Sequence, residues 1–234
     1  MVAVSLFLQP STLEISGGLR TNRRRLTLFF CTASVWVTMM SDLDTAVSDI
    51  KKGNLVVYPT ETVYGLGADA LSSSAIERVY EAKDRSKSKP ISLAVESTAA
   101  AQDYINPTSL EKRFMETFLP GPITVVCKRK ENVPDILTAG KEKVGVRVPD
   151  HDIARELAKQ AGPITATSAN RSGQASVTSI PELGDRIRDH VSTILDAGPT
   201  PGMGSTVVDI ESQTIHRRGH NVEQIEKWLD EHLS

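Results

Sequence analysis

Six short polar clusters are the places where this chain could do chemistry, and four of them directly follow an apolar, strand-like segment. The clusters are PTETVY (59–64), KDRSKSK (83–89), Lys143 with Arg147, TATSAN (165–170), GST (204–206) and RRG (217–219). Small hydroxyl residues and glycines let backbone N–H groups approach an anion, and lysine and arginine neutralise its charge. If the clusters converge, they predict a site for a phosphate-bearing ligand.

Other kinds of site are disfavoured by the motifs. The chain has no G-x-x-x-x-G-K-[ST] sequence, and Gly65-Leu66-Gly67 is a lone G-x-G without a third glycine. His216 and His220 are four residues apart, but Gly219 lies between them, so a solvated loop is favoured over a metal site. Cys127 falls in a predicted strand and is expected to be a small buried hydrophobe. No Ser-His-Asp order can be argued.

Each polar cluster also has a structural interpretation. The basic run 83–89 suits the solvated end of a helix, where cations are favourable. Ser168 and Asn170 suit a turn or a helix cap, and Arg147 suits a surface ion pair. Convergence decides between the two interpretations, because ligands of open α/β sheets gather at the carboxyl ends of strands.

The hydrophobic spacing predicts strands and helices that intermix along the chain after residue 40. Strands are expected at 55–58, 91–95, 123–127, 144–148, 163–167, 193–195, 205–210 and 214–217. Helices are expected to begin at Ser41, Ser74, Thr108, Asp150 and Asn221, with a further helix over 180–190. This order indicates one α/β domain, and some links are too short for a crossover, so the sheet should be mixed.

Composition agrees with a globular domain. The 234 residues suggest one domain, and a hydrophobic content of 39% with 24% charged residues suffices for a sizeable core. The net charge of -2 excludes a global basic field, so any positive site must be local. Two cysteines, Cys31 and Cys127, do not form a disulfide scaffold or a metal cluster and are compatible with a reducing cytosol.

Residues 1–39 differ from the rest of the chain. Arg23-Arg24-Arg25 followed by the apolar stretch 26–40 is similar to the start of a signal peptide, but no small-x-small cleavage site follows. Fifteen residues are also fewer than the ~20 that span a membrane. We favour a start at Met39 or Met40, with 1–39 as a mis-assigned start or a disordered extension and 40–234 as the catalytic domain.

Seven motifs in a fixed order carry a resemblance to a known family. They are PTETVYGLG (59–67), K-x-R (83–85), PGPIT (120–124), VGVRVP (144–149), SAN (168–170), STVVD (205–209) and RRG (217–219). Each motif is weak alone, but the ordered set resembles the YrdC-domain family of threonylcarbamoyl-AMP synthases over roughly residues 42–230, as a single-domain member.

The resemblance implies a fold and a reaction. The fold would be an open, twisted, mixed α/β sheet with a large, positively lined cavity. The enzyme would be a cytoplasmic nucleotidyltransferase that converts L-threonine, bicarbonate and ATP into threonylcarbamoyl-AMP and pyrophosphate, with Mg²⁺ carried by ATP and no metal site on the protein. The product would pass to a separate complex that makes threonylcarbamoyladenosine in tRNA. No membrane contact is expected.

The resemblance also assigns residues. Lys83 and Arg85 are expected to be catalytic and to face the ATP phosphates, and Thr62, Arg147 and Ser205 to bind threonine. The remaining ATP contacts are expected from Lys89, Lys143, Ser168, Asn170, Ser176 and Arg217. The chain departs from the family at Ser86, where relatives commonly have proline, at Gly204, and at Lys89, where relatives often have asparagine. The departures at Ser86 and Gly204 affect loop shape more than charge.

The residue types suit the implied chemistry, since transfer at phosphorus depends on positioning and electrostatics rather than on a protein nucleophile. Glu61 is the nearest candidate base, although a structural carboxylate is equally compatible. One alternative is a module that binds tRNA or double-stranded RNA without synthase activity, against which stand the acidic balance after residue 40 and the 5% aromatic content. Another is a carbamoyl-transfer domain like that of larger hydrogenase-maturation proteins.

Overall fold

The computed structural model describes residues 33–233, and the interpretations of the arginine-rich segment before them lie outside this range. Its strands form two sheets. The smaller sheet has the order β2 (Gly65–Gly67), β1 (Leu55–Tyr58), β7 (Val191–Ile194). The larger sheet has the order β6 (Ile164–Ala166), β3 (Ser92–Ala94), β5 (Lys143–Arg147), β4 (Ile123–Lys128), β8 (Thr206–Asp209), β9 (Thr214–Arg217).

Both sheets are mixed, as the short links predicted. In the smaller sheet β1 pairs antiparallel with β2 and parallel with β7. In the larger sheet β3–β5 and β4–β8 are parallel, and the β3–β6, β4–β5 and β8–β9 pairs are antiparallel. The expected strand pair at the end of the chain, β8 with β9, is thereby confirmed.

The two sheets are joined where β2 meets the end of β6. Gly65 bridges to Ser168, and the Leu66 N–H donates to the Thr167 carbonyl at 2.8 Å. The Thr165 hydroxyl donates to the Leu66 carbonyl at 2.8 Å and accepts from the Ala68 N–H at 3.0 Å. Thr165 is fully buried, so this junction is an internal part of the fold.

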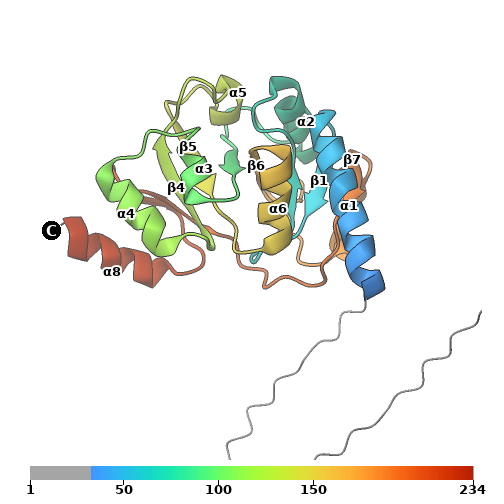
Figure 1. Ribbon diagram of the computed structural model, residues 1–234. Coiled ribbons are helices and arrows are strands. Elements are labelled where there is room, and N and C mark those ends of the chain that lie inside the picture. The colour runs from blue at the N-terminus through green and yellow to red at the C-terminus, as the bar shows by residue number, and fades with distance from the viewer. Residues whose placement is uncertain (1–32, 234) are drawn as a thin grey trace, which may run out of the picture. The chain divides into compact units, whose positions relative to one another are not determined.

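Helices cover the sheets in two groups (Figure 1). They are α1 (Ala33–Lys51), α2 (Ser73–Lys83), α3 (Thr98–Ala101), α4 (Ser109–Phe118), α5 (Asp135–Thr138), α6 (Asp152–Ala161), α7 (Asp185–Arg188) and α8 (Val222–Leu233), with a 3₁₀ turn at Ile180–Glu182. Helices α1 and α6 lie side by side against the smaller sheet, and α4 and α8 lie together at the other end of the molecule. Among the described residues, no helix has the length and apolar character needed to cross a membrane.

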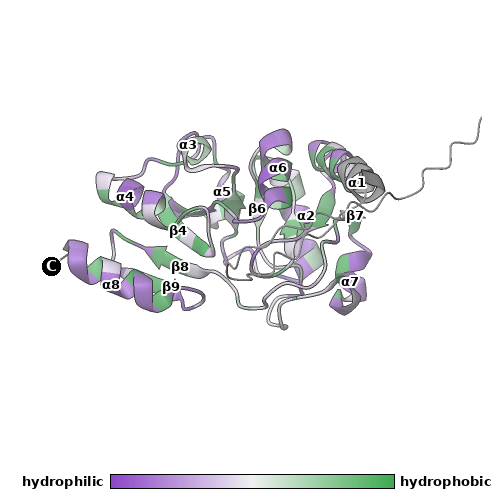
Figure 2. Ribbon diagram, turned by 60° about the horizontal axis from the view of Figure 1, so that its bottom comes forward, coloured by the Kyte–Doolittle hydropathy of each residue, from purple (hydrophilic) through white to green (hydrophobic). Residues whose placement is uncertain are grey.

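The core consists of two buried clusters. One joins α1 and α6 to β1 through residues such as Ile50, Val56 and Leu157. The other packs α4 and α8 against the larger sheet, with Phe114 and Trp228 in an edge-to-face contact at a centroid distance of 5.0 Å, and continues into α2, β1 and β2. Figure 2 shows that helices of both groups carry hydrophobic and hydrophilic residues together, as an amphipathic helix on a sheet must.

Local signals located most elements, but several boundaries differ from the predictions. The helix start expected at Thr108 is confirmed, and it forms a capping box: the Thr108 side chain accepts from the Glu111 N–H and the Glu111 carboxylate accepts from the Thr108 N–H. Helix α1 begins at Ala33 rather than at Ser41, because no glycine or proline interrupts residues 33–40. The expected boundary between residues 39 and 40 therefore falls within this helix.

Two other helix starts were misplaced, and one predicted helix is divided. Helix α2 is capped by Ser72 rather than Ser74, because the Ser72 hydroxyl accepts from the Ala75 N–H. His151 precedes α6 in the place expected for Asp150, whose carboxylate pairs with Arg155. The predicted helix over 180–190 is divided at Gly184 into a 3₁₀ turn and α7.

Candidate active site

A cavity of about 580 Å³ opens on one face of the larger sheet and reaches the smaller sheet. Alternate residues of three neighbouring strands line it, which are Thr124 and Val126, then Lys143, Gly145 and Arg147, then Val207 and Asp209. The residues between them, among them Val125 and Val146, are buried in the core on the opposite face. The period of two in a strand therefore divides each strand into a core side and a cavity side.

The floor of the cavity requires a residue without a side chain at its centre. A Cβ atom on Gly145 would lie 2.4 Å from the Ser92 Oγ and 2.9 Å from Thr124 Cγ2. Glycine at this position leaves space in the cavity above the middle of β5, between the side chains of Lys143 and Arg147.

One end of the cavity is built around Arg147. Its Nη2 donates to the Thr62 hydroxyl at 2.8 Å and lies 2.9 Å from the Glu61 carboxylate, and only 8% of the residue is exposed. The Thr60 hydroxyl holds the turn that carries Thr62, because it accepts from the Thr62 N–H at 3.1 Å and donates to the Val63 carbonyl at 2.6 Å. Arg147 is thus fixed before any ligand arrives.

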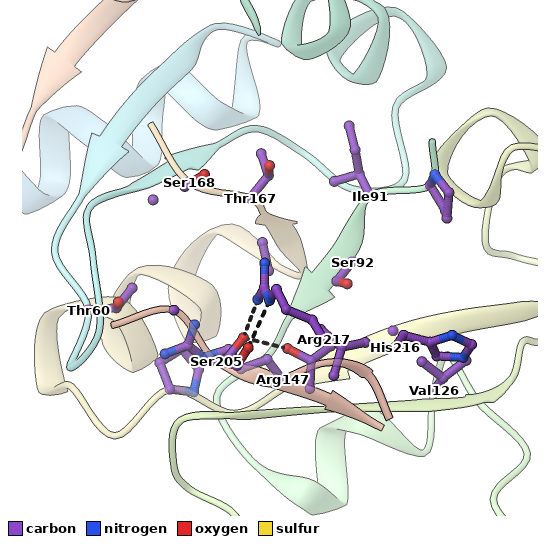
Figure 3. A pocket seen from close by; sticks show the side chains of 18 of the residues that line it. Thr60, Ile91, Ser92, Val126, Arg147, Thr167, Ser168, Ser205, His216 and Arg217 are labelled. Atoms are coloured by element: carbon purple, nitrogen blue, oxygen red, sulfur yellow. Dashed lines mark hydrogen bonds between the residues drawn. The ribbon is translucent and has the colours of Figure 1, made fainter. Parts of the chain in front are cut away.

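Arg217 and Ser205 form a second fixed pair on the adjoining strands. The Arg217 Nη2 donates to the Ser205 hydroxyl at 2.7 Å, and its Nε donates to the Ser205 carbonyl at 2.8 Å. Figure 3 shows this guanidinium directed at Ser205 within the cavity. Burial, together with the neighbouring Arg147 and Arg85 charges, lowers the pKa of Arg217, which means that the cavity gathers positive charge.

Arg85 contributes from the loop that follows α2. Its Nη2 donates to the Pro90 carbonyl at 2.9 Å and its Nε to the Lys89 carbonyl at 3.2 Å. The Tyr80 hydroxyl donates to the same Lys89 carbonyl at 3.0 Å. Lys89 therefore contributes its backbone to the loop, whereas its side chain is absent from the cavity lining.

Lys143 lies on the cavity but its charge is matched. Its ammonium is 2.8 Å from the Asp209 carboxylate and 2.7 Å from that of Glu211. Partial burial opposes the charged form, but the hydrogen bonds to these two carboxylates outweigh it and raise the pKa of Lys143. Two carboxylates therefore already neutralise the charge of this lysine.

Seven of the eleven predicted site residues line the cavity, and four do not. The seven are Arg85, Lys143, Arg147, Ser168, Ser176, Ser205 and Arg217. Thr62 lies directly behind Arg147, Lys89 points elsewhere, and Lys83 and Asn170 are buried behind the wall that carries Ser168. The Asn170 amide donates to the Arg171 and Gln174 carbonyls at 3.0 and 2.7 Å and so shapes that segment.

Several lining residues were not predicted from the sequence. They are Ser92, Thr124, Lys141, Glu142, Asp209 and His216. The alternation of β4 and β8 would have identified Thr124 and Asp209, since each lies on the polar side of an otherwise apolar strand. Ser92 and Lys141 carried no local signal, because their place on the cavity depends on strand pairing.

The donor groups do not fit a metal ion held by the protein. No group of three or more His, Cys, Asp or Glu residues comes together within residues 33–233 in an arrangement suited to a metal. Two carboxylates, Glu142 and Asp209, lie on the cavity, but Asp209 is occupied by Lys143 and the Ser212 N–H. The arrangement instead suits a polyanionic ligand that meets arginines and hydroxyls.

Comparisons with known proteins agree on one family. The Sua5_yciO_yrdC model, described as "Telomere recombination", matches residues 48–219. A threonylcarbamoyl-AMP synthase of Pyrococcus abyssi is 37% identical over 192 residues, which is 80% of this chain and 56% of that protein. A putative threonylcarbamoyl-AMP synthase of Methanocaldococcus jannaschii is 36% identical over 168 residues, covering 71% of this chain and 79% of that one.

Solved structures give the same result. The crystal structure of P. abyssi Sua5 complexed with L-threonine superposes with a TM-score of 0.76 at 36% identity, covering 81% of this chain and 57% of that chain. The present chain thus spans less than two thirds of the P. abyssi protein. The likeness confirms the predicted open mixed α/β fold.

Proposed function

This chain belongs to the Sua5/YciO/YrdC family, and from that premise we propose that it is a threonylcarbamoyl-AMP synthase. It would form threonylcarbamoyl-AMP and pyrophosphate from L-threonine, bicarbonate and ATP, as a nucleotidyltransferase. The observation that carries the proposal is the cavity in which Arg147 and the Ser205–Arg217 pair are fixed in advance among hydroxyl groups.

The reaction has two bond-forming steps. The threonine amine attacks the carbon of bicarbonate, water leaves, and a carbamate results. A carbamate oxygen then attacks the α-phosphorus of ATP, and the bond to the β,γ-diphosphate breaks to release pyrophosphate. Because an anion approaches a polyanion, the protein must supply positive charge and alignment rather than a nucleophile.

The geometry suggests a division of roles. We assign the threonine carboxylate to Arg147, with Thr62 and Glu61 holding its guanidinium and Ser205 nearby. We assign ATP to Arg85, Lys143, Ser168, Ser176 and Arg217, which line the rest of the cavity. Asn170 would act through the segment that carries Ser168, and Lys89 through the loop that carries Arg85.

Mg²⁺ would arrive as part of the substrate. A magnesium ion needs few protein ligands when ATP phosphates and water supply the others. We propose a cytoplasmic location, because the reaction consumes ATP, and a downstream complex that transfers the threonylcarbamoyl group to tRNA.

The test is pyrophosphate release by the full chain. We expect release from ATP with Mg²⁺ that requires both L-threonine and bicarbonate, and no release when either is omitted. Binding of tRNA or double-stranded RNA without any such release would reject the synthase and favour an RNA-binding module.

Arg147→Ala provides the matching residue-level test. Removing a charge that fixes a carboxylate should lower kcat/KM for threonine about a hundredfold or more, because charge-assisted contacts in a desolvated site cost ~2–5 kcal/mol when lost. Arg113→Ala, which removes an exposed arginine on α4, is the control and should behave like the wild type. An unchanged kcat/KM in Arg147→Ala would overturn the carboxylate assignment.

A further inference from the structure

The side chain of Lys83 is used inside the protein rather than in the cavity. Lys83 is the last residue of α2, and only 1% of its surface is exposed. Its ammonium donates to the carbonyl of Asn170 at 2.7 Å and to the carbonyl of Ser168. It is absent from the lining of the cavity, whereas Arg85, two residues later, is part of it.

Two further contacts join the same two segments. The Ser172 N–H donates to the Lys83 carbonyl at 2.7 Å. The Asp84 carboxylate accepts from the Arg171 Nε at 3.0 Å and forms an ion pair with the same guanidinium. We call these contacts between residues 83–84 and residues 168–172 the clasp.

The chemistry of the clasp centre is unusual for a purely structural contact. An ammonium buried with carbonyl acceptors and no carboxylate pays a large desolvation cost, and a methionine would fill a similar volume without it. Burial, with a smaller contribution from the Arg85 charge, lowers the pKa of Lys83 to about 7. The lysine provides one donor group for the carbonyls of both Ser168 and Asn170, which converge on its ammonium.

The clasp sits between two parts of the cavity wall. On one side, α2 continues into the loop that places Arg85, and on the other side the clasped segment begins with Ser168. Fixing the carbonyls of Ser168 and Asn170 to the end of α2 sets the spacing between these two cavity residues.

We propose that Lys83 is a positioning residue, which fixes the wall segment 168–172 relative to Arg85 and does not itself contact the substrate. This replaces the direct phosphate contact that the family resemblance implied for Lys83. Its effect on turnover rests on the proposed synthase activity, but the clasp itself does not.

The first test asks where the amine of Lys83 lies. Lysines of the wild-type full chain are labelled with acetic anhydride, with and without ATP, and read by mass spectrometry. Lys83 should stay unlabelled in both conditions, whereas the exposed Lys87 should react in both. Labelling of Lys83 that ATP suppresses would overturn the proposal, because it would place the amine at the phosphates.

The second test uses hydrogen exchange without any ligand, comparing Lys83→Met with Lys87→Met. Loss of two hydrogen bonds from a charged donor should speed exchange in peptides covering 168–176 about tenfold or more in Lys83→Met. Lys87→Met removes an equal charge from the exposed loop and should leave these peptides unchanged. Equal exchange in the two variants would reject the clasp.

Conservative substitution keeps the proposal testable if Lys83→Met does not fold. Lys83→Arg retains donors for both carbonyls and should restore slow exchange over 168–176. Lys83→Gln also carries two N–H donors, but its shorter, uncharged side chain does not reach as far as the ammonium and should restore slow exchange less. Equal exchange in Lys83→Arg and Lys83→Gln would contradict the requirement for a long cationic donor that reaches both carbonyls. If the wild type released no pyrophosphate, the synthase proposal would fail while labelling and exchange would still decide the clasp.

Discussion

At the scale of single residues, the site depends on cations whose direction is set by neighbours. Arg147 is held by Thr62 and Glu61, and Arg217 is held by Ser205. Glu61 lies beside Arg147 and outside the cavity lining, so its position suits a partner of that guanidinium better than a catalytic base. Cationic side chains can therefore line the cavity or bond within the protein, as the contrast between Arg147 and Lys83 shows.

The buried Lys83 predicts how the stability of the protein depends on pH. Its pKa falls from 10.5 in the unfolded chain to about 7 in the folded protein. Between these values the unfolded chain binds more protons than the folded protein, so this group makes the protein more stable as pH rises. From pH 7 to 9, the free energy of unfolding of the wild type should gain about 2 kcal/mol relative to Lys83→Met.

Urea unfolding at pH 7 and pH 9 measures this difference. Lys87→Met should show the same pH trend as the wild type, because it leaves Lys83 in place. If the difference in unfolding free energy between the wild type and Lys83→Met stayed constant from pH 7 to pH 9, Lys83 would have its ordinary pKa in the folded protein.

At the scale of elements, alternation along β4, β5 and β8 assigns one face to the core and the other to the cavity. The polar face lines the cavity, and short backbone contacts keep the strand ends in place. At one such contact, Gly219 follows β9 and packs on Gly204 and Ser205, just before β8.

Gly219→Ala tests this contact. An added Cβ would meet the Gly204 carbonyl oxygen at 2.2 Å and the Ser205 carbonyl carbon at 2.8 Å, so the backbone that carries Ser205 must move. We expect a loss of about 1–3 kcal/mol in unfolding free energy and at least a tenfold lower kcat/KM.

Gly184→Ala is the matched control for that substitution. A Cβ at Gly184 meets nothing within 4 Å, and the backbone there has a φ of -66°, which any residue adopts. Its stability should stay within about 1 kcal/mol of the wild type and its activity should not change. If Gly184→Ala lost as much unfolding free energy and kcat/KM as Gly219→Ala, the close packing of Gly219 against Gly204 and Ser205 would not be the cause of the loss.

At the scale of the whole molecule, the cavity exists because two sheets are joined at β2 and β6. Tyr58 and Gly65 reach it from the smaller sheet, and the other lining residues come from strands of the larger sheet and from the loops that flank the strands. Thr165 is central to the junction, since its hydroxyl bonds two backbone groups near β2 and its carbonyl accepts from the Tyr58 hydroxyl at 3.1 Å.

Thr165→Val should weaken the junction without changing its volume greatly. The Leu66 carbonyl and the Ala68 N–H would both lose a buried partner, which costs about 1–3 kcal/mol in unfolding free energy. Thr214→Val, on the exposed edge strand β9, should stay within about 0.5 kcal/mol of the wild type. Denaturant unfolding followed by circular dichroism compares them, and equal stability would show that the junction does not depend on this hydroxyl.

The sequence by itself determined the class of the fold, most strands, the helix start at Thr108 and the family, because these depend on local periodicity and on motifs in a fixed order. It also grouped Lys143 with Arg147, and the two share one strand face because the period of a strand is set by the backbone.

Only the tertiary structure decided which cations line the cavity and which bond within the protein. The direction of Lys83 follows from the carbonyls of Ser168 and Asn170, 85 and 87 positions along the chain, and no local pattern reports them. The short strand β2 was likewise missed, because its glycines form a strand only where the Tyr58 ring packs across them and β1 pairs with it. Contacts between distant segments are set by strand pairing and packing, and these become visible only when the chain is folded.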